Sequence, residues 1–316
     1  MIQINRREFG AVSTACISGA ILAQAPVKAA SEGIIDTHTH FYDPTRPQGV
    51  PWPGKNDRLL YRKVLPDEFK KLVMPQGVTG TVVVEASPLL EDNQWLLDLA
   101  KDDPYLPGIV GHLTPGSDDF GKQFDRFAKD RKFQGIRISE GGLIKGLDQK
   151  SYLDNLRKLA DADRQLDVNG GPGTPAVVAK LAQAIPALRI VINHAANVRI
   201  DGKAPPDAWQ KAMQEAARQK NVWCKVSALV EGTGKSDGSA PKEVEFYKPV
   251  LDHLWESFGE DRLIFGSNWP VSVRFATYAT LFEIVDKYFT AKGKPVRAKF
   301  FAKNALAAYR WPTVRE

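Results

Sequence analysis

The chain has 316 residues, of which 43% are hydrophobic and 25% are charged, so it can bury a large core without covalent cross-links. This length fits either one large α/β barrel or two ordinary domains. The formal net charge of +6 is small, and the chain contains no long run of Lys or Arg. Both observations argue against nucleic acid as a partner.

Residues 1–29 are typical of an export signal. Arg6 and Arg7 precede an apolar run of small residues, 10–25, that contains no acidic residue, and Ala29 completes a signal-peptidase motif. Paired arginines followed by a bulky apolar residue resemble a twin-arginine signal. The run is shorter than the roughly 20 residues that span a bilayer, which disfavours a retained membrane anchor. We therefore expect cleavage, export to the bacterial periplasm and no membrane association of the mature protein.

Cleavage would also change the charge and the cysteine content. Loss of three basic residues and one acidic residue lowers the formal net charge from +6 to +4. Cys16 would be removed, and Cys224 alone cannot form an intramolecular disulfide. A chain without disulfides suits the twin-arginine route, which exports proteins already folded in a reducing cytosol.

Strand-like and helix-like segments alternate after the signal. The strand-like runs are short, rich in Val, Ile and Leu, and mostly end at Gly, Pro, Ser or Asn, as in a parallel sheet buried on both faces. They cover residues 33–38, 81–86, 108–113, 134–138, 166–169, 189–193, 222–226 and 262–266. Helical spacing and helix-start residues predict helices over 66–73, 92–99, 120–131, 152–163, 176–184, 205–220, 241–258, 278–289 and 296–309.

Eight strands, each followed by a helix, are typical of a (β/α)8 TIM barrel. The alternative is a doubly wound open sheet, but that fold would begin with a Gly-rich phosphate-binding turn, and none follows the first strand. Residues 41–65 are rich in Pro, Gly and Trp, and we expect them to form a flap over the strand ends. We therefore predict a single barrel domain over residues 30–316.

Unusual polar residues collect at the carboxyl ends of the expected strands, where such barrels build their active sites. His38 and His40 lie two residues apart on the first strand, so their side chains share one face. By itself this spacing would also be found if both histidines lay on the protein surface with no functional role. The other strand ends carry Glu85, His112, Arg137, Asn169, His194, Lys225, Asn268 and Trp269. Because four of the five histidines fall at these ends, we expect an active site there.

Five motifs in chain order are Ile35-Asp36-Thr37-His38-Thr39-His40 and residues 133–137, 191–194, 224–227 and 262–271. Together they resemble the amidohydrolase superfamily, and within it the amidohydrolase 2 branch that includes sugar-lactone and pyrone-dicarboxylate lactonases. The likeness covers about residues 34–310. It implies a distorted barrel that opens a small cyclic ester, sugar-derived or carboxylated, by water attack on a carbonyl with stabilisation of the oxyanion.

Carried over by position, the resemblance implies that His38, His40 and His194 hold the substrate carbonyl or a metal ion. Arg137 would grip a substrate carboxylate or hydroxyl, since its planar fork suits paired contacts. Asn268 stands where the family normally has an aspartate that takes the proton of water. The fifth strand also lacks the histidine of metal-dependent relatives. We therefore expect no cofactor, with zinc or another divalent ion on the three histidines as the alternative.

The proton acceptor stays open among Glu85, Glu231 and a histidine. The position of Glu85 at a strand end is equally explained by a structural ion pair with Arg137 or Lys225. The position of Lys225 is likewise explained by an ion pair with a glutamate. Four further residues are candidates for substrate contact. As alternatives, the histidine among them could support residues that contact the substrate, and the tryptophan could belong to the hydrophobic core. The four are Asn169, Lys225, His112 and Trp269.

The sequence thus predicts an exported hydrolase that opens a small lactone. One alternative is a zinc-dependent decarboxylase of the same branch, a lyase that holds metal against a carboxylate. Another is a non-catalytic binding barrel that has lost its aspartate at position 268. The expected partner is a small-molecule substrate, and homo-oligomerisation is left open.

Overall fold

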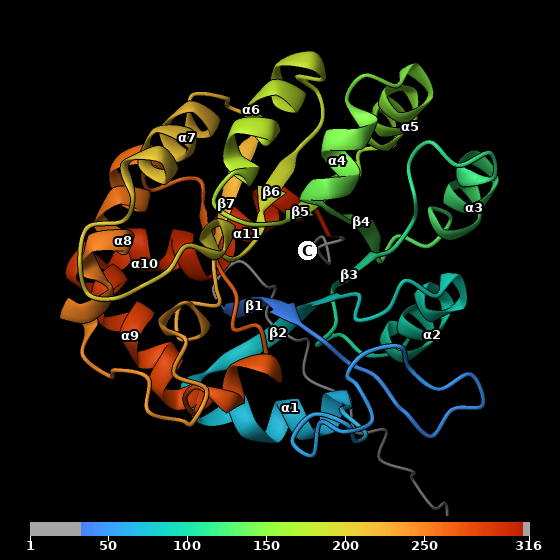
Figure 1. Ribbon diagram of the computed structural model, residues 1–316. Helices are drawn as coiled ribbons and strands as arrows, with labels where there is room; N and C mark the ends of the chain where they lie inside the picture. Colours follow the sequence, from blue (N-terminus) through green and yellow to red (C-terminus); the bar gives the residue numbers. More distant parts are fainter. Residues whose placement is uncertain (1–32, 312–316) are drawn as a thin grey trace, which may run out of the picture.

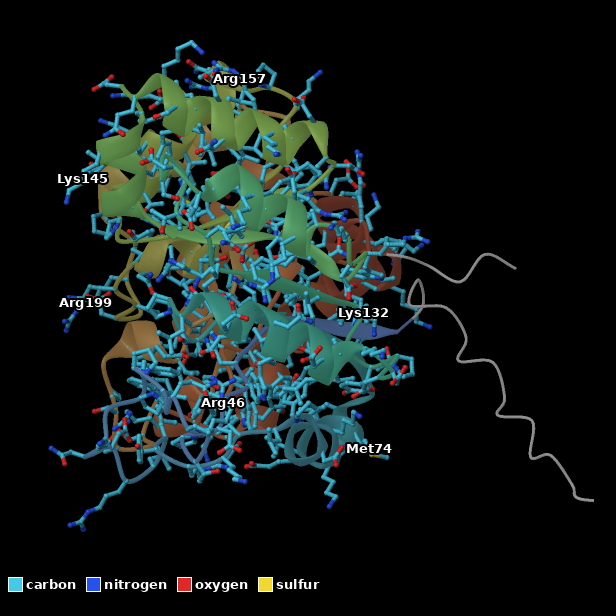
Figure 2. The ribbon with its side chains drawn as sticks, turned by 90° about the vertical axis from the view of Figure 1, so that its right-hand side faces the viewer. Arg46, Met74, Lys132, Lys145, Arg157 and Arg199 are labelled. Carbon is cyan, nitrogen blue, oxygen red and sulfur yellow. The ribbon has the colours of Figure 1, made fainter. Side chains whose placement is uncertain are left out.

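The computed structural model describes residues 33–311, so the predicted signal peptide, residues 1–29, lies outside the described part. Eight parallel strands follow one another around the sheet in chain order, with helices outside them (Figure 1). This arrangement confirms the predicted (β/α)8 barrel. Figure 2 shows the barrel from the side, with the exposed side chains of Lys145, Arg157 and Arg199 projecting from it. No helix within residues 33–311 is both long and apolar enough to cross a membrane.

All eight predicted strands form, and all but the seventh have shifted ends. They are β1 (Ile34–Thr39), β2 (Val78–Val84), β3 (Gly108–Gly111), β4 (Phe133–Ser139), β5 (Gln165–Asn169), β6 (Ile190–Ile192), β7 (Val222–Val226) and β8 (Leu263–Phe265). The largest difference is in β2, which begins at Val78 instead of residue 81. The strand includes Gly80, where glycine fits because a Cβ would lie 3.0 Å from Ile35 Cδ1 and 3.2 Å from the Tyr105 carbonyl oxygen.

The predicted helices form, all but the first with shifted ends, and one further short α-helix was not predicted. The α-helices are α1 (Pro66–Val73), α2 (Leu90–Ala100), α3 (Phe120–Phe127), α4 (Glu140–Gly146), α5 (Lys150–Asp161), α6 (Thr174–Ala184), α7 (Asp207–Ala217), α8 (Val244–Phe258), α9 (Tyr278–Ala291), α10 (Lys294–Ala298) and α11 (Asn304–Tyr309). The short, glycine-rich α4 was not predicted, and the Ser139 hydroxyl caps it by accepting from Gly142 N at 3.1 Å. The helix predicted over 296–309 forms, beginning at Lys294, and a π-helical turn, Lys299–Lys303, joins α10 to α11 within it.

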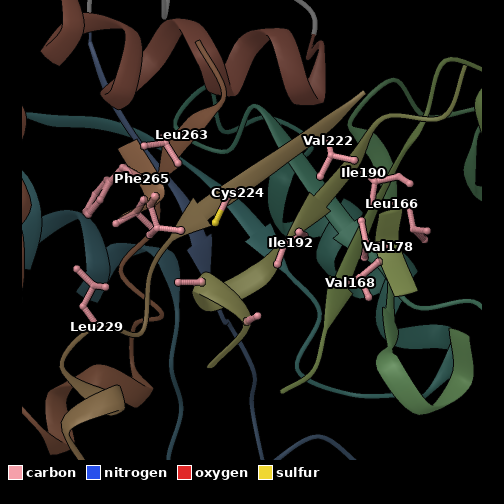
Figure 3. Close-up of a cluster of buried hydrophobic side chains, with 14 of the residues drawn as sticks. Leu166, Val168, Val178, Ile190, Ile192, Val222, Cys224, Leu229, Leu263 and Phe265 are labelled. Carbon is pink, nitrogen blue, oxygen red and sulfur yellow. The ribbon is translucent and has the colours of Figure 1, made fainter. Parts of the chain in front are cut away.

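The apolar core lies in two places. Strand residues that face outward pack against the surrounding helices; Figure 3 shows this cluster around Val168, Ile192 and Cys224. Inward-facing strand residues pack against α11 in a second cluster. Asn304 Nδ2 of α11 donates to the carbonyl of Leu263, the first residue of β8, at 2.9 Å. The helix therefore closes the amino-terminal end of the barrel and leaves the carboxyl ends of the strands for the site.

The seam between β1 and β8 is closed by an isolated bridge and by side chains. Thr37 Oγ1 donates to the Phe265 carbonyl at 2.6 Å. The buried carboxylate of Asp36 accepts from Ser267 N at 2.8 Å and from the Tyr278 hydroxyl at 3.1 Å. Burial raises the pKa of Asp36 to about 6 although these donors oppose the rise. Side-chain hydrogen bonds therefore fix the position of β8 against β1.

The insertion at residues 41–65 folds back on itself near the carboxyl end of β1. Tyr42 pairs with Val64 in an antiparallel bridge, and its hydroxyl donates to the Leu60 carbonyl at 2.9 Å. Arg274 Nη2 holds the far part of the insertion by donating to Asp57 Oδ2 at 2.6 Å.

Candidate active site at the carboxyl ends of the strands

A cavity of about 410 Å³ opens at the carboxyl ends of the strands. One side of it is polar, and the other is formed by apolar groups from the insertion and the loops after β2, β7 and β8. The cavity is lined by His40, Arg137, Asn169, His194, Asn197, Glu231, Asn268, Trp52, Ala86, Ala228, Val271 and Phe275. Five of the ten predicted site residues therefore line one cavity.

The three predicted site histidines lie together. The ring centroid of His38 is 5.0 Å from that of His40 and 4.3 Å from that of His194. Burial, reinforced by nearby cationic groups, lowers the pKa of each ring, and that of His40 falls to about 3. All three rings are therefore neutral at neutral pH. Each is held through Nδ1: His38 by Lys225 Nζ at 3.2 Å, His40 by the Val84 carbonyl at 2.9 Å, and His194 by Ser227 Oγ at 2.8 Å.

These contacts determine two of the three tautomers. An ammonium group only donates, so Nδ1 of His38 accepts from Lys225 and the ring proton lies on Nε2. That Nε2 is buried and has no hydrogen-bond partner among residues 33–311. A carbonyl only accepts, so His40 carries its proton on Nδ1. His38 does not line the cavity itself, but its Nε2–H donor lies next to the cavity-lining rings of His40 and His194; the Nε2 of His40 is an acceptor.

An unusual turn after β6 places His194 on the cavity. His194, Ala195, Ala196 and Asn197 all have positive φ, between 47° and 57°. The left-handed conformation costs non-glycine residues roughly 1–2 kcal/mol each, and such backbones cluster at functional sites. The same turn brings in Asn197, which was not predicted; its Nδ2 donates to the Gly170 carbonyl at 2.7 Å.

Arg137 and Glu85 form an ion pair beside the cavity. Arg137 Nε donates to Glu85 Oε1, and Nη2 donates to the Glu85 backbone carbonyl, both at 2.8 Å. Glu85 thus forms the structural ion pair with Arg137 that was the alternative to a role as proton acceptor, and its carboxylate does not line the cavity. Among residues 33–311, Nη1 of Arg137 has no protein partner and remains available to a ligand.

Lys225 lies beneath the site, outside the cavity lining. Its ammonium is fully buried and pairs with the fully buried carboxylate of Asp167 at 2.8 Å. The predicted glutamate partner is therefore wrong, because β5 presents an aspartate to β7 across the barrel interior. Lys225 does not line the cavity, and among residues 33–311 it contacts the site through His38, which does not support the predicted contact with substrate.

Two other predicted substrate contacts lie elsewhere. His112 lines a separate cavity of about 270 Å³ with Phe120. The Trp269 ring is 1% exposed and packs on Phe69, with ring centroids 5.2 Å apart. We therefore assign Trp269 to the core and place His112 outside the site. Asn169 does line the cavity, where its Oδ1 accepts from Asn197 Nδ2 at 3.3 Å.

Glu231 and Asn268 complete the polar side of the cavity. Asn268 Nδ2 donates to Glu231 Oε1 at 2.9 Å, and Asn268 Oδ1 lies 3.3 Å from His40 Nε2. Burial raises the pKa of Glu231 to about 7, against the opposing effect of the Asn268 amide. Asn268 itself has a φ of 58°, so strained backbone recurs at the end of β8.

The donor set does not fit a resident metal ion. The three histidines lie together, but no group of three or more His, Cys, Asp or Glu within residues 33–311 is arranged to hold a metal. Asn268 supplies no charge, and the cations Arg137 and Lys225 are nearby, which disfavours a divalent ion. The cofactor-free expectation stays a prediction.

The fold and the cavity together define a (β/α)8 barrel with its candidate site at the carboxyl ends of the strands. The family model described as amidohydrolase matches residues 35–311. An L-fucono-1,5-lactonase from Burkholderia ambifaria is 32% identical over 289 residues, which cover 87% of this chain and 95% of that protein. The chain belongs to the amidohydrolase family and is a hydrolase.

Solved structures agree with this fold. An amidohydrolase from Burkholderia multivorans with bound HEPES has a TM-score of 0.80 at 24% identity, over 88% of this chain and 99% of that one. A second structure from that organism, with bound zinc, has a TM-score of 0.78 at 25% identity over the same shares. Zinc in that relative contrasts with the donor set found here.

Proposed function

We propose that the protein opens a neutral, sugar-derived lactone by hydrolysis. The observation that carries this proposal is the charge balance of the cavity. Among the described residues that line it, Arg137 is the only Lys or Arg, and Glu85 already neutralises it. A carboxylated lactone would therefore find no unpaired cation. The L-fucono-1,5-lactonase relative supports a sugar lactone as the substrate class.

The cavity offers hydrogen-bonding groups for a polyhydroxylated ring. Its polar side includes Asn169, Asn197 and Arg137. The two amides and Nη1 of the arginine can form hydrogen bonds with hydroxyl groups of the ring. Trp52 and Phe275 form the apolar side, against which the carbon face of a sugar ring can lie. Such a division into polar and apolar walls is typical of sites for small polar ligands.

His38 is the group that we assign to the lactone carbonyl. Its buried Nε2–H lacks a partner among the described residues and can donate to the carbonyl oxygen. When the oxygen of water attacks the carbonyl carbon, negative charge develops on that oxygen, and a preformed donor in a dry site stabilises it. The ring carbon–oxygen bond then breaks, and the leaving oxygen takes up a proton to become a hydroxyl group.

Turnover of a panel of aldono-1,4- and aldono-1,5-lactones, followed by acid release, tests this function. We expect at least tenfold higher kcat/KM for neutral lactones than for a pyrone dicarboxylate. His38→Asn should lower kcat by about 10²–10³. The matched control His112→Asn, outside the cavity, should leave kcat within twofold. Preference for the dicarboxylate would refute the substrate class, and ligand binding without turnover would favour a non-catalytic barrel.

We further propose that the enzyme acts in the periplasm. The support is the pattern of residues 1–29, with Arg6-Arg7 ahead of the apolar run. The decarboxylase alternative is disfavoured, because it needs a metal ion that the donor set does not fit.

A further inference from the structure

The end of β8 carries a carboxamide, yet a carboxylate lies next to it. Glu231 belongs to the short 3-10 helix Glu231–Thr233 that follows β7, and its Oε1 accepts from Asn268 Nδ2 at 2.9 Å. Both side chains line the cavity that also holds His40 and His194. A negative group is therefore present at this corner of the site, one side chain away from position 268.

Glu231 differs from the three other acidic side chains near the site, which are already engaged. Asp36 accepts from Ser267 and Tyr278, Asp167 pairs with Lys225, and Glu85 pairs with Arg137. By contrast, Oε2 of Glu231 is buried without a hydrogen-bond partner among residues 33–311. A buried carboxylate oxygen without a hydrogen-bond donor is energetically costly. Oε2 is therefore suited to accept a hydrogen bond from a molecule bound in the cavity.

We propose that Glu231 is the general base of the reaction and takes the place of the missing aspartate, with Asn268 as its positioning residue. The proposal rests on the lactone hydrolysis proposed above. Oε2 accepts a proton from water as the water oxygen bonds to the lactone carbonyl carbon. The ring carbon–oxygen bond then breaks, and Glu231 returns that proton to the leaving oxygen. The products are one hydroxyl group and one carboxylic acid, which ionises to solvent.

The surroundings of Glu231 suit this task. Burial holds the pKa of its carboxyl at about 7, which is near the optimum for a general base at neutral pH. Tyr247 of α8 faces it as a neutral phenol whose pKa is raised mainly by burial. The other titratable groups on the cavity are Arg137, His40 and His194, and both histidines are neutral because burial lowers their pKa.

Asn268 acts by holding the carboxylate. Its Nδ2 donates to Oε1, which leaves Oε2 as the reactive oxygen. An aspartate at position 268 would instead place two carboxylates within hydrogen-bonding distance, and such pairs share one proton. The carboxylate and the carboxamide can, however, exchange positions. Aspartate at 268 together with glutamine at 231 again gives one carboxylate and one carboxamide, with the negative charge now at the end of β8.

Kinetics of four variants against a neutral lactone test the proposal. Glu231→Gln should lower kcat by 10²–10⁴-fold with KM changed less than threefold. Wild-type kcat/KM should rise with pH to a plateau above about pH 7, and this rise should vanish in Glu231→Gln. Glu231→Asp should keep the rise at reduced rate. Asn268→Asp should be impaired, and the double variant Asn268→Asp/Glu231→Gln should regain at least tenfold over Glu231→Gln.

Glu256→Gln, an exposed change on α8, is the matched control and should keep wild-type kinetics. Circular dichroism establishes that each variant is folded. A Glu231→Gln enzyme with kcat within threefold of wild type and an unchanged pH profile would overturn the base assignment alone. A wild-type enzyme inactive on every lactone would overturn both this assignment and the proposed function, so the two failures are distinguishable.

Discussion

Glutamine at position 231 should make the folded protein more stable above pH 7. Burial raises the pKa of the Glu231 carboxyl from 4.5 to about 7, so ionising it in the folded state costs free energy. Below about pH 4.5 the group is protonated in both the folded and unfolded states and has no effect. Between these values the free energy of unfolding falls as pH rises, because the folded state binds more protons. Above pH 7 the cost has its full size.

The size of this cost follows from the shift. At about 1.4 kcal/mol per pKa unit, the difference between 4.5 and about 7 corresponds to about 3 kcal/mol at most. Partial exposure of Glu231 screens its charge, so a gain of about 1–2 kcal/mol is expected from Glu231→Gln at pH 9. For a domain of this size that corresponds to a rise in Tm of roughly 2–6 °C.

Thermal unfolding at pH 5 and pH 9 measures the effect. The difference in Tm between Glu231→Gln and wild type should be small at pH 5 and positive at pH 9. Asp36 has a pKa raised in the same direction, but it is common to both proteins and cancels in the comparison. Glu256→Gln serves again as the exposed control. A variant no more stable than wild type at pH 9 would refute a buried, costly carboxylate at 231.

Three further predictions concern the core, metal and export. Lys225→Met leaves Asp167 as an unpaired buried charge and should lower the free energy of unfolding by about 3–5 kcal/mol in urea titrations; a loss under about 1 kcal/mol would contradict the pairing. Enzyme purified without chelators should hold less than stoichiometric metal and keep kcat/KM within twofold after chelation; a stoichiometric, activity-linked zinc would overturn this. Replacing Arg6 and Arg7 with lysines should retain the protein in the cytoplasm, as fractionation would show, whereas periplasmic protein with this change would exclude the twin-arginine route.

Much of the barrel could be predicted because its strands are local apolar runs. β7 lies where the run Val222–Val226 was expected, since both of its faces are buried. Strand ends depend instead on neighbours distant in sequence. The close approach of Ile35 and of the Tyr105 carbonyl accounts for glycine inside β2 at position 80, although glycine in the sequence indicates a break. The π-helical turn after α10 lies inside a continuous helix, and the sequence pattern of that helix gave no signal for it.

The site could be predicted only in part, for a related reason. The two-residue spacing of His38 and His40 places both side chains on one face, and their rings are indeed 5.0 Å apart. The choice between Glu85 and Glu231 needed three-dimensional information, because Arg137 from β4 engages one and leaves the other on the cavity. Asn197 was missed because a left-handed turn of non-glycine residues is not encoded by any local pattern.

The side-chain closure between β1 and β8 has a consequence for how the enzyme fails under stress. His38 and His40 stand on one side of this seam, whereas Asn268 lies on the other side and holds Glu231. The remaining strands are joined by backbone ladders, so the seam is the natural boundary between independently opening parts of the barrel. A small local opening there would separate the proposed proton acceptor, Glu231, from the proposed carbonyl-binding group, His38, while most of the sheet stays paired. Loss of turnover should therefore precede loss of secondary structure as denaturant is added.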